Sequence, residues 1–541
     1  MHATTHPTAP IAGQKPGTSG LRKKTRVFMG ADYLENFTQA LFNALGGVAG
    51  KTFVLGGDGR YFNDRAAQVI LRMAAAQGAA RVIVGQGALL STPAASHLIR
   101  SRRTDGGIIL SASHNPGGPD EDFGIKFNTP NGGPAPEAIT AAIHAQTESL
   151  SEYRILEAQD IDLSRIGAHD LAGMAVEVVD PVADHAALME TLFDFDAIRA
   201  LFRSGFRMKF DAMHAITGPY AAHVLEHILG APLGTVVNAT PQPDFGGHHP
   251  DPNPTHARLL HEHLMGPKAP DFGAASDGDG DRNMILGRGI YVSPSDSLAV
   301  IAANAHLAPG WAGGLRGVAR SMPTSRAVDR VAAARGWPCF ATPTGWKFFG
   351  SLLDSGRVSL CGEESFGTGA DHVREKDGLW AVLMWLNILA VRRQSVAEVL
   401  AAHWQEFGRD YYSRHDYEGV DAGGATALVD SLRGRLDGLA GTAAGPLTVR
   451  AARDFAYTDP VDGATATGQG LEIDFEGGAR AVLRLSGTGT EGATLRVYLE
   501  RPEAERLDLE PAEALAPVAL AVAALADIEG HTGRTTPDVV T

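Results

Sequence analysis

Short apolar runs alternate with longer helical patterns over the first part of the chain. The runs "KTFVLGGDGR" (51–60), "ARVIVG" (80–85) and "GGIILSASHNPGG" (106–118) have the length and branched apolar residues of strands, and each leads into a glycine-rich turn. The segment "AAQVILRMAAAQG" (66–78) between the first two is typical of an amphipathic helix. Strand, turn, helix and strand in this order predict a parallel sheet wrapped by helices.

Two later segments repeat this unit. "RMKFDAMHAITGPYAAHVLEHILG" (207–230) and "RGVARSMPTSRAVDRVAAARG" (316–336) both run from a strand pattern through a polar turn into a helix pattern. Three such openings suggest three α/β domains of related design with mixed sheets.

The last part of the chain has a different pattern. "LEIDFEGG" (471–478), "ARAVLRLSGTG" (479–489) and "ATLRVYLE" (493–500) resemble consecutive strands, and a closing helix is expected over 511–528. This pattern fits a smaller α+β domain. The chain has 541 residues, whereas one hydrophobic core stops growing near ~250–300 residues. We therefore expect three α/β domains followed by the α+β domain, with these limits: 1–180, 181–294, 295–405 and 406–541.

Composition narrows the class of partner. The chain has 62 acidic and 47 basic residues, a formal charge of −15, so neither nucleic acid nor an anionic membrane is an expected partner. The two cysteines form no C-x-x-C pair, and the longest apolar run (515–526) is too short to span a bilayer. The first residues lack a basic segment followed by an apolar one. We expect a cytoplasmic protein that binds any phosphate-bearing ligand at a local basic site.

The turn "SASHNPGG" (111–118) is the first candidate for chemistry. It follows an apolar strand, and open α/β sheets place their sites at the carboxyl ends of strands. A serine hydroxyl, Ser111 or Ser113, would be presented there. Taken alone, the same letters also fit a plain Asn-Pro-Gly turn.

The segment "SDGDGDRN" (276–283) spaces three aspartates two residues apart, namely Asp277, Asp279 and Asp281. Carboxylates aimed at one point require a hard cation, most simply Mg²⁺. An EF-hand calcium loop would need glycine and glutamate where Arg282 and Arg288 stand. A plain acidic turn remains the alternative.

The segment "RLSGTGTEGATLR" (484–496) offers an anion pocket in which the hydroxyls of Ser486, Thr488 and Thr490 would be joined by Arg496. Its glycines also satisfy the dinucleotide fingerprint G-x-G-x-x-G. A strand pattern follows them instead of a helix, so we exclude NAD binding. A glycine-rich hairpin without a ligand is the other interpretation.

Four further polar loops contain glycine: 16–24, 343–350, 361–367 and 374–378. Glu363 and Ser365 could bind sugar hydroxyls, and Lys376 could carry a proton if its neighbours lowered its pKa. A nucleophile candidate, a hard-metal loop, an anion pocket and a polyol-binding loop together predict phosphoryl transfer on a small polar metabolite.

The order of these motifs resembles that of the α-D-phosphohexomutases. The matching segments, over nearly the whole chain, are "QKPGTSGLRKK", "GGIILSASHNPGG", "DGDGDRN", "SMPTS", "PTGWKFFG", "CGEESFGTG", "REKDGLWAVL", "DPVDG" and "RLSGTGTEGATLR". The resemblance implies four domains around a central cleft, the fourth being a phosphate-binding domain. It also implies that Ser113, directly before the histidine, is the phosphoserine.

The same matching implies roles for the remaining positions. The metal ligands would be Asp277, Asp279, Asp281 and an oxygen on Ser113. Groups at the reacting phosphoryl or its acceptor would be Arg22, Arg282 and Lys376, with His114 and Lys376 as acid/base candidates. Sugar ligands would be Thr344, Gly345, Glu363 and Ser365, and the non-reacting phosphate would be held by Ser486, Thr488, Thr490 and Arg496.

The loop "GEESFG" indicates the substrate, because the broader mannose/glucose branch of these enzymes usually has a "GExSGH" pattern there. The implied enzyme is an Mg²⁺-dependent isomerase that interconverts glucose 1-phosphate and glucose 6-phosphate, with glucose 1,6-bisphosphate as activating intermediate. We expect hexose phosphates as its partners and a monomer or weak dimer.

Three alternatives stay open. One is another hexose or pentose phosphate as the main substrate, and a second is a non-catalytic sugar-phosphate-binding protein. A hydrolase is the third, although the G-x-S-x-G motif of a serine hydrolase is absent around Ser113.

Overall fold

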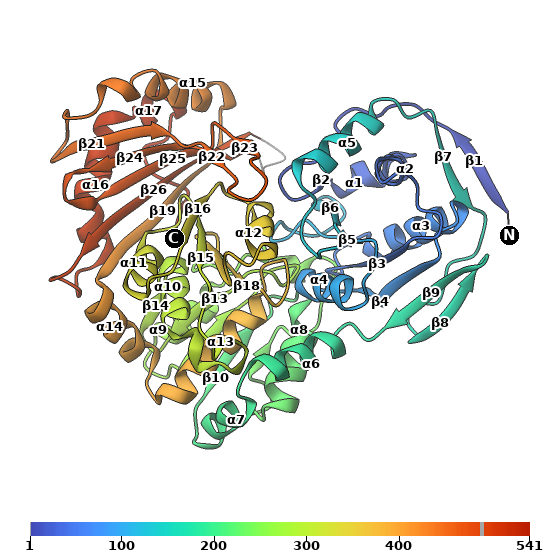
Figure 1. Ribbon diagram of the computed structural model, residues 1–541, viewed down its shortest axis with the longest axis horizontal. Helices are drawn as coiled ribbons and strands as arrows, with labels where there is room; N and C mark the ends of the chain where they lie inside the picture. Colours follow the sequence, from blue (N-terminus) through green and yellow to red (C-terminus); the bar gives the residue numbers. More distant parts are fainter. Residues whose placement is uncertain (1, 487–491) are drawn as a thin grey trace.

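The computed structural model describes residues 2–486 and 492–541. Figure 1 shows the blue and cyan N-terminal part on the right, the orange and red C-terminal part on the upper left, and the green and yellow parts between and below them. The predicted architecture, three α/β domains with mixed sheets and a C-terminal α+β domain, is confirmed.

The first three domains share one sheet topology. In each, the first strand pairs in parallel with the second and the third, and the fourth strand runs antiparallel to the third. In domain I these strands are β3 (Thr52–Gly57), β4 (Arg81–Leu89), β5 (Gly107–Leu110) and β6 (Asp122–Asn128). In domain II they are β10 (Met208–Asp211), β11 (Val236–Val237), β12 (Phe272–Ala275) and β13 (Met284–Gly287), and in domain III β15 (Val318–Ser321), β16 (Cys339–Thr342), β17 (Leu360–Glu363) and β18 (Gly367–Ala370). The expected internal repeat is therefore present.

Additional strands extend two of these sheets. The domain I sheet has the order β2-β6-β5-β3-β4-β9-β8, and the domain II sheet ends in β14. The added strands are β2 (Leu21–Lys24), β8 (Gly167–Leu171), β9 (Met174–Val179) and β14 (Ile290–Val292). A separate antiparallel pair joins β1 (Ala3–Pro7) to β7 (Glu152–Leu156).

Helices cover the sheets, and local sequence fixes several of their starts. Ser91 accepts a hydrogen bond from the backbone N–H of Ala94 at the start of α4, and Ser395 forms a capping box with Glu398 at the start of α14. In domain I the helices are α1 (Thr25–Phe28), α2 (Tyr33–Ala44), α3 (Asn63–Ala76), α4 (Thr92–Ser101) and α5 (Glu137–Thr147). In domains II and III they are α6 (Ala183–Leu192), α7 (Phe195–Arg203), α8 (Thr217–Ala221), α9 (Arg258–Met265), α10 (Pro294–Asn304), α11 (Ala327–Arg335), α12 (Gly350–Asp354), α13 (Gly378–Arg392) and α14 (Val396–Phe407).

Domain IV is built on an antiparallel sheet of order β20-β21-β24-β25-β26-β19-β27. Its strands are β19 (Arg409–Val420), β20 (Ala443–Ala444), β21 (Leu447–Asp454), β24 (Leu471–Phe475), β25 (Arg480–Ser486), β26 (Ala493–Glu503) and β27 (Val539–Val540). A short hairpin of β22 (Tyr457–Thr458) and β23 (Thr465–Ala466) stands apart from the sheet. The helices are α15 (Ala422–Arg433), α16 (Pro511–Leu525) and α17 (Ile528–Thr532).

The closing helix is shorter than expected. It ends at Leu525 instead of continuing to Ile528, because Ala526 adopts an extended backbone. Asp527 then caps a new short helix by accepting a hydrogen bond from the Gly530 N–H. Among the described residues, no helix combines the length and the hydropathy that a bilayer crossing requires.

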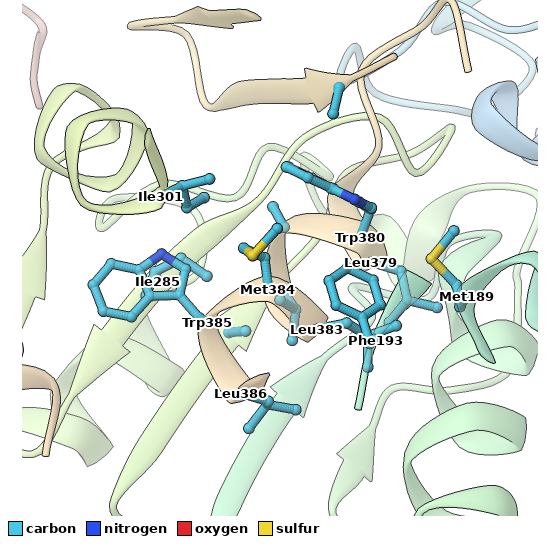
Figure 2. Close-up of a cluster of buried hydrophobic side chains, with 14 of the residues drawn as sticks. Met189, Phe193, Ile285, Ile301, Leu379, Trp380, Leu383, Met384, Trp385 and Leu386 are labelled. Atoms are coloured by element: carbon cyan, nitrogen blue, oxygen red, sulfur yellow. The ribbon is translucent and has the colours of Figure 1, made fainter. Parts of the chain in front are cut away.

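Helix α13 is the centre of the largest hydrophobic cluster. Its residues from Gly378 to Leu389 are all buried, and Trp380 and Trp385 are the largest fully buried side chains. Figure 2 shows these indoles among side chains from β13, α10 and α6. A helix that is apolar on every side needs partners all around it, so α13 packs domains II and III into one core.

This packing predicts a large stability cost for truncation on α13. Leu383→Ala removes a fully buried side chain and should lower the free energy of unfolding by about 2–5 kcal/mol. Urea unfolding followed by tryptophan fluorescence measures it. Leu520→Ala, at a position 60% exposed on α16, is the matched control and should change stability by less than about 0.5 kcal/mol. Equal effects would contradict the assignment of the core.

Candidate active site

The candidate site is built from the same loop of each repeated domain. The connection between the third and fourth strands contains 111–121 in domain I, 276–283 in domain II and 364–366 in domain III. These loops touch. The backbones of Arg282 and Gly367 pair in an isolated antiparallel β-bridge, and a Cβ added to Gly278 would lie only 2.3 Å from the Ser113 carbonyl oxygen. The topology therefore brings three distant sequence segments to one point.

Ser113 is held in an uncommon backbone conformation, with φ at +53°. Its N–H donates to Ser111 Oγ (2.7 Å), and the Ser111 hydroxyl donates to Asp58 Oδ2 (2.7 Å). Arg60, paired with Asp58 at 2.9 Å, donates to the Ser113 carbonyl oxygen at 2.7 Å. A positive φ is costly for a residue with a side chain and persists only where its surroundings fix it. Ser111 thus supports the turn that presents Ser113.

The Ser113 hydroxyl meets a carboxylate from domain II. Ser113 Oγ donates to Asp277 Oδ2 at 3.0 Å, and His114 Nδ1 lies 3.4 Å from the same hydroxyl oxygen. Ser113 is only 4% exposed. Of the two serines left open by the sequence, Ser113 is the one placed against the aspartates.

The three aspartates have the arrangement of a cation site. Asp277, Asp279 and Asp281 are buried, and one ligand oxygen of each lies within 4.8 Å of the others. Burial, reinforced by the neighbouring carboxylates, raises the pKa of both Asp277 and Asp281. Oδ1 of Asp279 and Oδ1 of Asp281 have no hydrogen-bond partner among the described residues. These features together show a cluster able to bind a hard cation.

Two lysines and an arginine surround the carboxylates. Lys126 Nζ lies 3.2 Å from Asp279 Oδ2, and Lys376 Nζ lies 3.2 Å from Asp281 Oδ2. Arg282 Nε is 3.9 Å from Asp277 Oδ2. Burial alone would raise the pKa of Asp279, but the Lys126 ammonium, the Thr92 hydroxyl and the Lys376 ammonium together outweigh burial, and the pKa is lowered. The site therefore mixes both signs of charge, as a phosphoryl-transfer site requires.

The sequence makes Lys376 a possible proton carrier on the condition that its neighbours lower its pKa, and they do not. Burial disfavours its charged form, yet the nearby carboxylates of Asp281 and Glu363 outweigh burial, so the pKa is raised. Lys376 is thus held as an ammonium, suited to bind or protonate an oxygen. Lys376 nevertheless lies at the aspartate cluster, beside Asp281.

His114 has the opposite electrostatic environment. Burial, followed by the guanidinium charges of Arg282 and Arg22, lowers its pKa well below the ordinary value. Burial likewise lowers the pKa of Arg22. A neutral imidazole beside the Ser113 hydroxyl can accept a proton, so the geometry is compatible with the predicted acid/base role.

Domain III brings the candidate sugar ligands to the same region. The Gly345 N–H donates to Glu363 Oε1 at 2.7 Å, which joins the loops 343–350 and 361–367. Gly345 has φ +124°, and a Cβ there would lie 2.7 Å from Thr18 Cγ2, so glycine is required. Thr344 Oγ1 has no partner among the described residues, and Ser365 is 8% exposed. All four predicted sugar ligands lie in these two joined loops.

Domain IV contributes a basic residue facing this region. Arg496 Nε lies 3.5 Å from Asp416 Oδ2, and the Arg496 charge contributes to lowering the pKa of His114. Ser486 ends β25 directly before the glycine-rich segment. Thr488 and Thr490 lie outside the described residues.

Sequence reasoning missed several polar residues that hold the site together. They are Asp58, Arg60, Lys126, Asp251 and Glu375. Lys126 gave a usable signal, because a lysine inside the buried strand β6 needs a carboxylate partner. Asp251 lies 3.0 Å from Arg282, but it belongs to a loop well before Arg282 in the sequence, and no sequence pattern indicated this contact.

Comparison with known proteins identifies the family. Models of the phosphoglucomutase/phosphomannomutase α/β/α domains I, II and III match residues 13–154, 184–289 and 294–407. A model of the phosphoglucomutase-1 C-terminal domain matches 409–538. A phosphoglucomutase of Rhizobium radiobacter is 60% identical over 536 residues, 99% of both chains. The chain belongs to the phosphoglucomutase family.

Two further phosphoglucomutases, one of them with a solved structure, match this chain over nearly its full length. The crystal structure of pp63/parafusin, a phosphoglucomutase from Paramecium, in its open form, superposes with a TM-score of 0.92 at 46% identity and covers 100% of this chain and 99% of its own. An Arabidopsis thaliana protein described as a probable cytoplasmic phosphoglucomutase is 49% identical over 576 residues, 99% of this chain and 98% of its own. The predicted family and enzyme class, an isomerase, are confirmed.

The aspartate cluster predicts measurable metal binding in this family member. Asp281→Asn removes one of three charges and should weaken Mg²⁺ binding, measured by isothermal titration calorimetry, by at least about tenfold. The control Asp196→Asn changes a side chain of domain II that is 92% exposed and should leave binding unchanged. Equal affinity in both variants would show that the cluster is not the metal site.

Proposed function

We propose that this chain interconverts glucose 1-phosphate and glucose 6-phosphate through a phosphorylated Ser113. The observation that carries the proposal is the placement of the Ser113 hydroxyl 3.0 Å from Asp277, within the aspartate cluster and beside a basic wall of Lys126, Lys376 and Arg282. This is the environment that phosphoryl transfer needs, since positioning and charge neutralisation dominate its catalysis.

We infer that Mg²⁺ is the resident cation. The residues fit it, because three clustered carboxylates offer hard oxygen ligands and two of their oxygens have no partner among the described residues. Asp277, Asp279, Asp281 and an oxygen on phosphorylated Ser113 would hold it, and it would offset negative charge on the phosphoryl group.

The chain's own groups handle the proton and the phosphoryl group. When phospho-Ser113 gives its phosphoryl group to a sugar hydroxyl, the bond from phosphorus to Ser113 Oγ breaks and the hydroxyl loses a proton. Neutral His114 is the candidate acceptor of a proton at this centre, and the Lys376 ammonium the candidate donor when an oxygen is released. Arg22 and Arg282 would bind the phosphoryl oxygens.

The second half of the reaction needs the other end of the sugar at the same serine. Glucose 1,6-bisphosphate formed in the first half reorients in the site and then returns its other phosphate to Ser113. Glu363, Ser365, Thr344 and Gly345 would hold the sugar hydroxyls in both orientations. The phosphate that is not reacting would be bound by Ser486, Thr488, Thr490 and Arg496. Because these residues belong to a separate domain IV, that domain could move and give the bisphosphate room to reorient.

Glucose phosphates are the preferred substrates because the loop at Glu363–Ser365 reads "GEESFG". The cytoplasm remains the proposed location; relatives described as cytoplasmic and as chloroplastic are both found among the matches. A monomer or weak dimer remains our expectation for the assembly.

Removal of the phosphoryl carrier tests the function. Ser113→Ala should abolish interconversion of glucose 1-phosphate and glucose 6-phosphate, with kcat reduced by at least about a thousandfold, while thermal unfolding stays near wild type. Ser151→Ala, at an exposed position of domain I, is the matched control and should keep full activity. Full activity of Ser113→Ala would overturn the assignment.

Product analysis separates the alternatives. The wild-type enzyme should convert glucose 1-phosphate with a higher kcat/KM than mannose 1-phosphate and release little inorganic phosphate. A preference for mannose 1-phosphate would replace the proposed substrate. Accumulation of inorganic phosphate in place of the isomer would indicate a hydrolase.

A further inference from the structure

The segment 321–325, "SMPTS", has no part in the chemistry proposed above, yet it is buried. It follows β15 and precedes α11, and Ser321, Thr324 and Ser325 are each at most 1% exposed. Polar side chains are rarely buried so completely without specific hydrogen bonds. The bonds of Ser321 and Thr324 point to a function for this segment.

The hydroxyls of Ser321 and Thr324 form hydrogen bonds with Glu364, in the middle of the candidate sugar-binding loop. Glu364 Oε2 accepts from Ser321 Oγ at 2.9 Å and from Thr324 Oγ1 at 3.4 Å, and the Glu364 N–H donates to Thr324 Oγ1 at 2.9 Å. Glu364 is 2% exposed. It stands between Glu363 and Ser365, so fixing its backbone and its carboxylate fixes both neighbours.

Domain IV holds the other side of the segment. Arg480 at the start of β25 is 1% exposed and donates to the carbonyl oxygens of Met322 and Thr324, both at 2.8 Å. Its guanidinium is itself held by Glu500 at 2.6 Å and Glu472 at 3.1 Å. Strand β25 begins at Arg480 and ends at Ser486, so one strand connects the Arg480 contacts to the candidate phosphate-binding segment.

A second arginine holds the segment from domain III. Arg320 Nη1 lies 3.2–3.3 Å from the carbonyl oxygens of Ser321, Met322 and Thr324, and the Arg320 guanidinium is paired with Asp329 at 2.6 Å. Two guanidinium groups on one short segment leave it little freedom. The segment is thus a rigid support between two domains.

We propose that Glu364 is a positioning residue that ties the sugar-binding loop to this support, so that Glu363 and Ser365 keep a fixed place relative to domain IV. The proposal rests on the proposed function, because it assumes that Glu363 and Ser365 bind the sugar. Loss of the hydrogen bonds between this segment and Glu364 should weaken sugar binding. The aspartate cluster should stay intact, because the hydroxyls of Ser321 and Thr324 bond to Glu364 and not to the aspartates.

The test compares two substitutions at one position. Thr324→Val removes the hydroxyl at nearly constant shape, and Thr324→Ser keeps it. Thr324→Val should raise the KM for glucose 1-phosphate and the dissociation constant of glucose 1,6-bisphosphate by about tenfold, and Thr324→Ser should restore both. Mg²⁺ affinity should stay at the wild-type value in both variants.

A second pair keeps the test decisive if Thr324→Val fails to fold. Ser321→Ala removes the shorter hydroxyl contact to Glu364, and Ser297→Ala removes a buried hydroxyl of the same domain that bonds to Trp385 instead. Ser321→Ala should raise the KM and Ser297→Ala should not. A lower thermal midpoint with unchanged KM in the Ser321 and Thr324 variants would show a merely structural role and overturn the positioning proposal.

The two proposals fail in distinguishable ways. Wild-type enzyme that neither turns over glucose 1-phosphate nor binds glucose 1,6-bisphosphate would overturn the proposed function and the positioning proposal with it. Wild-type enzyme that is active, with variants of unchanged KM and binding, would overturn the positioning proposal alone.

Discussion

Three carboxylates buried at one point are the constraint on which the site depends. Asp277, Asp279 and Asp281 repel one another in a region with little water, and such a cluster is stable only when positive charge surrounds it. Lys126 from domain I, Arg282 from domain II and Lys376 from domain III supply that charge. The positive charges that compensate one loop therefore come from three domains.

The same constraint explains why Ser113 lies where it does. A hydroxyl can join the cluster only if the turn from domain I reaches across to domain II, and the turn does so with an unfavourable backbone at Ser113. The buried Asp58–Arg60 pair and Ser111 offset that strain by bonding the backbone on both sides of the residue. Strain and support together present one serine and not its neighbour.

Local patterns predicted the repeated α/β units, the strands of domain IV and the aspartate cluster, because strand period, glycine turns and carboxylate spacing are properties of short segments. They did not predict the end of α16, where Ala526 adopts an extended backbone and only Ala526 and Asp527 separate two helices. Nor did they predict the charge of Lys376 or the partner of Arg282. Asp281 and Asp251 reach those groups only through the tertiary fold, and spacing along the chain carries no record of it.

The central claim is that Ser113 carries the phosphoryl group. Intact mass followed by peptide mapping, with and without prior incubation with glucose 1,6-bisphosphate, measures this directly. The account predicts one phosphate-sized mass increment per chain after incubation, located on Ser113. An increment on another residue, Ser111 included, or no increment at all under conditions where the enzyme turns over, would contradict it.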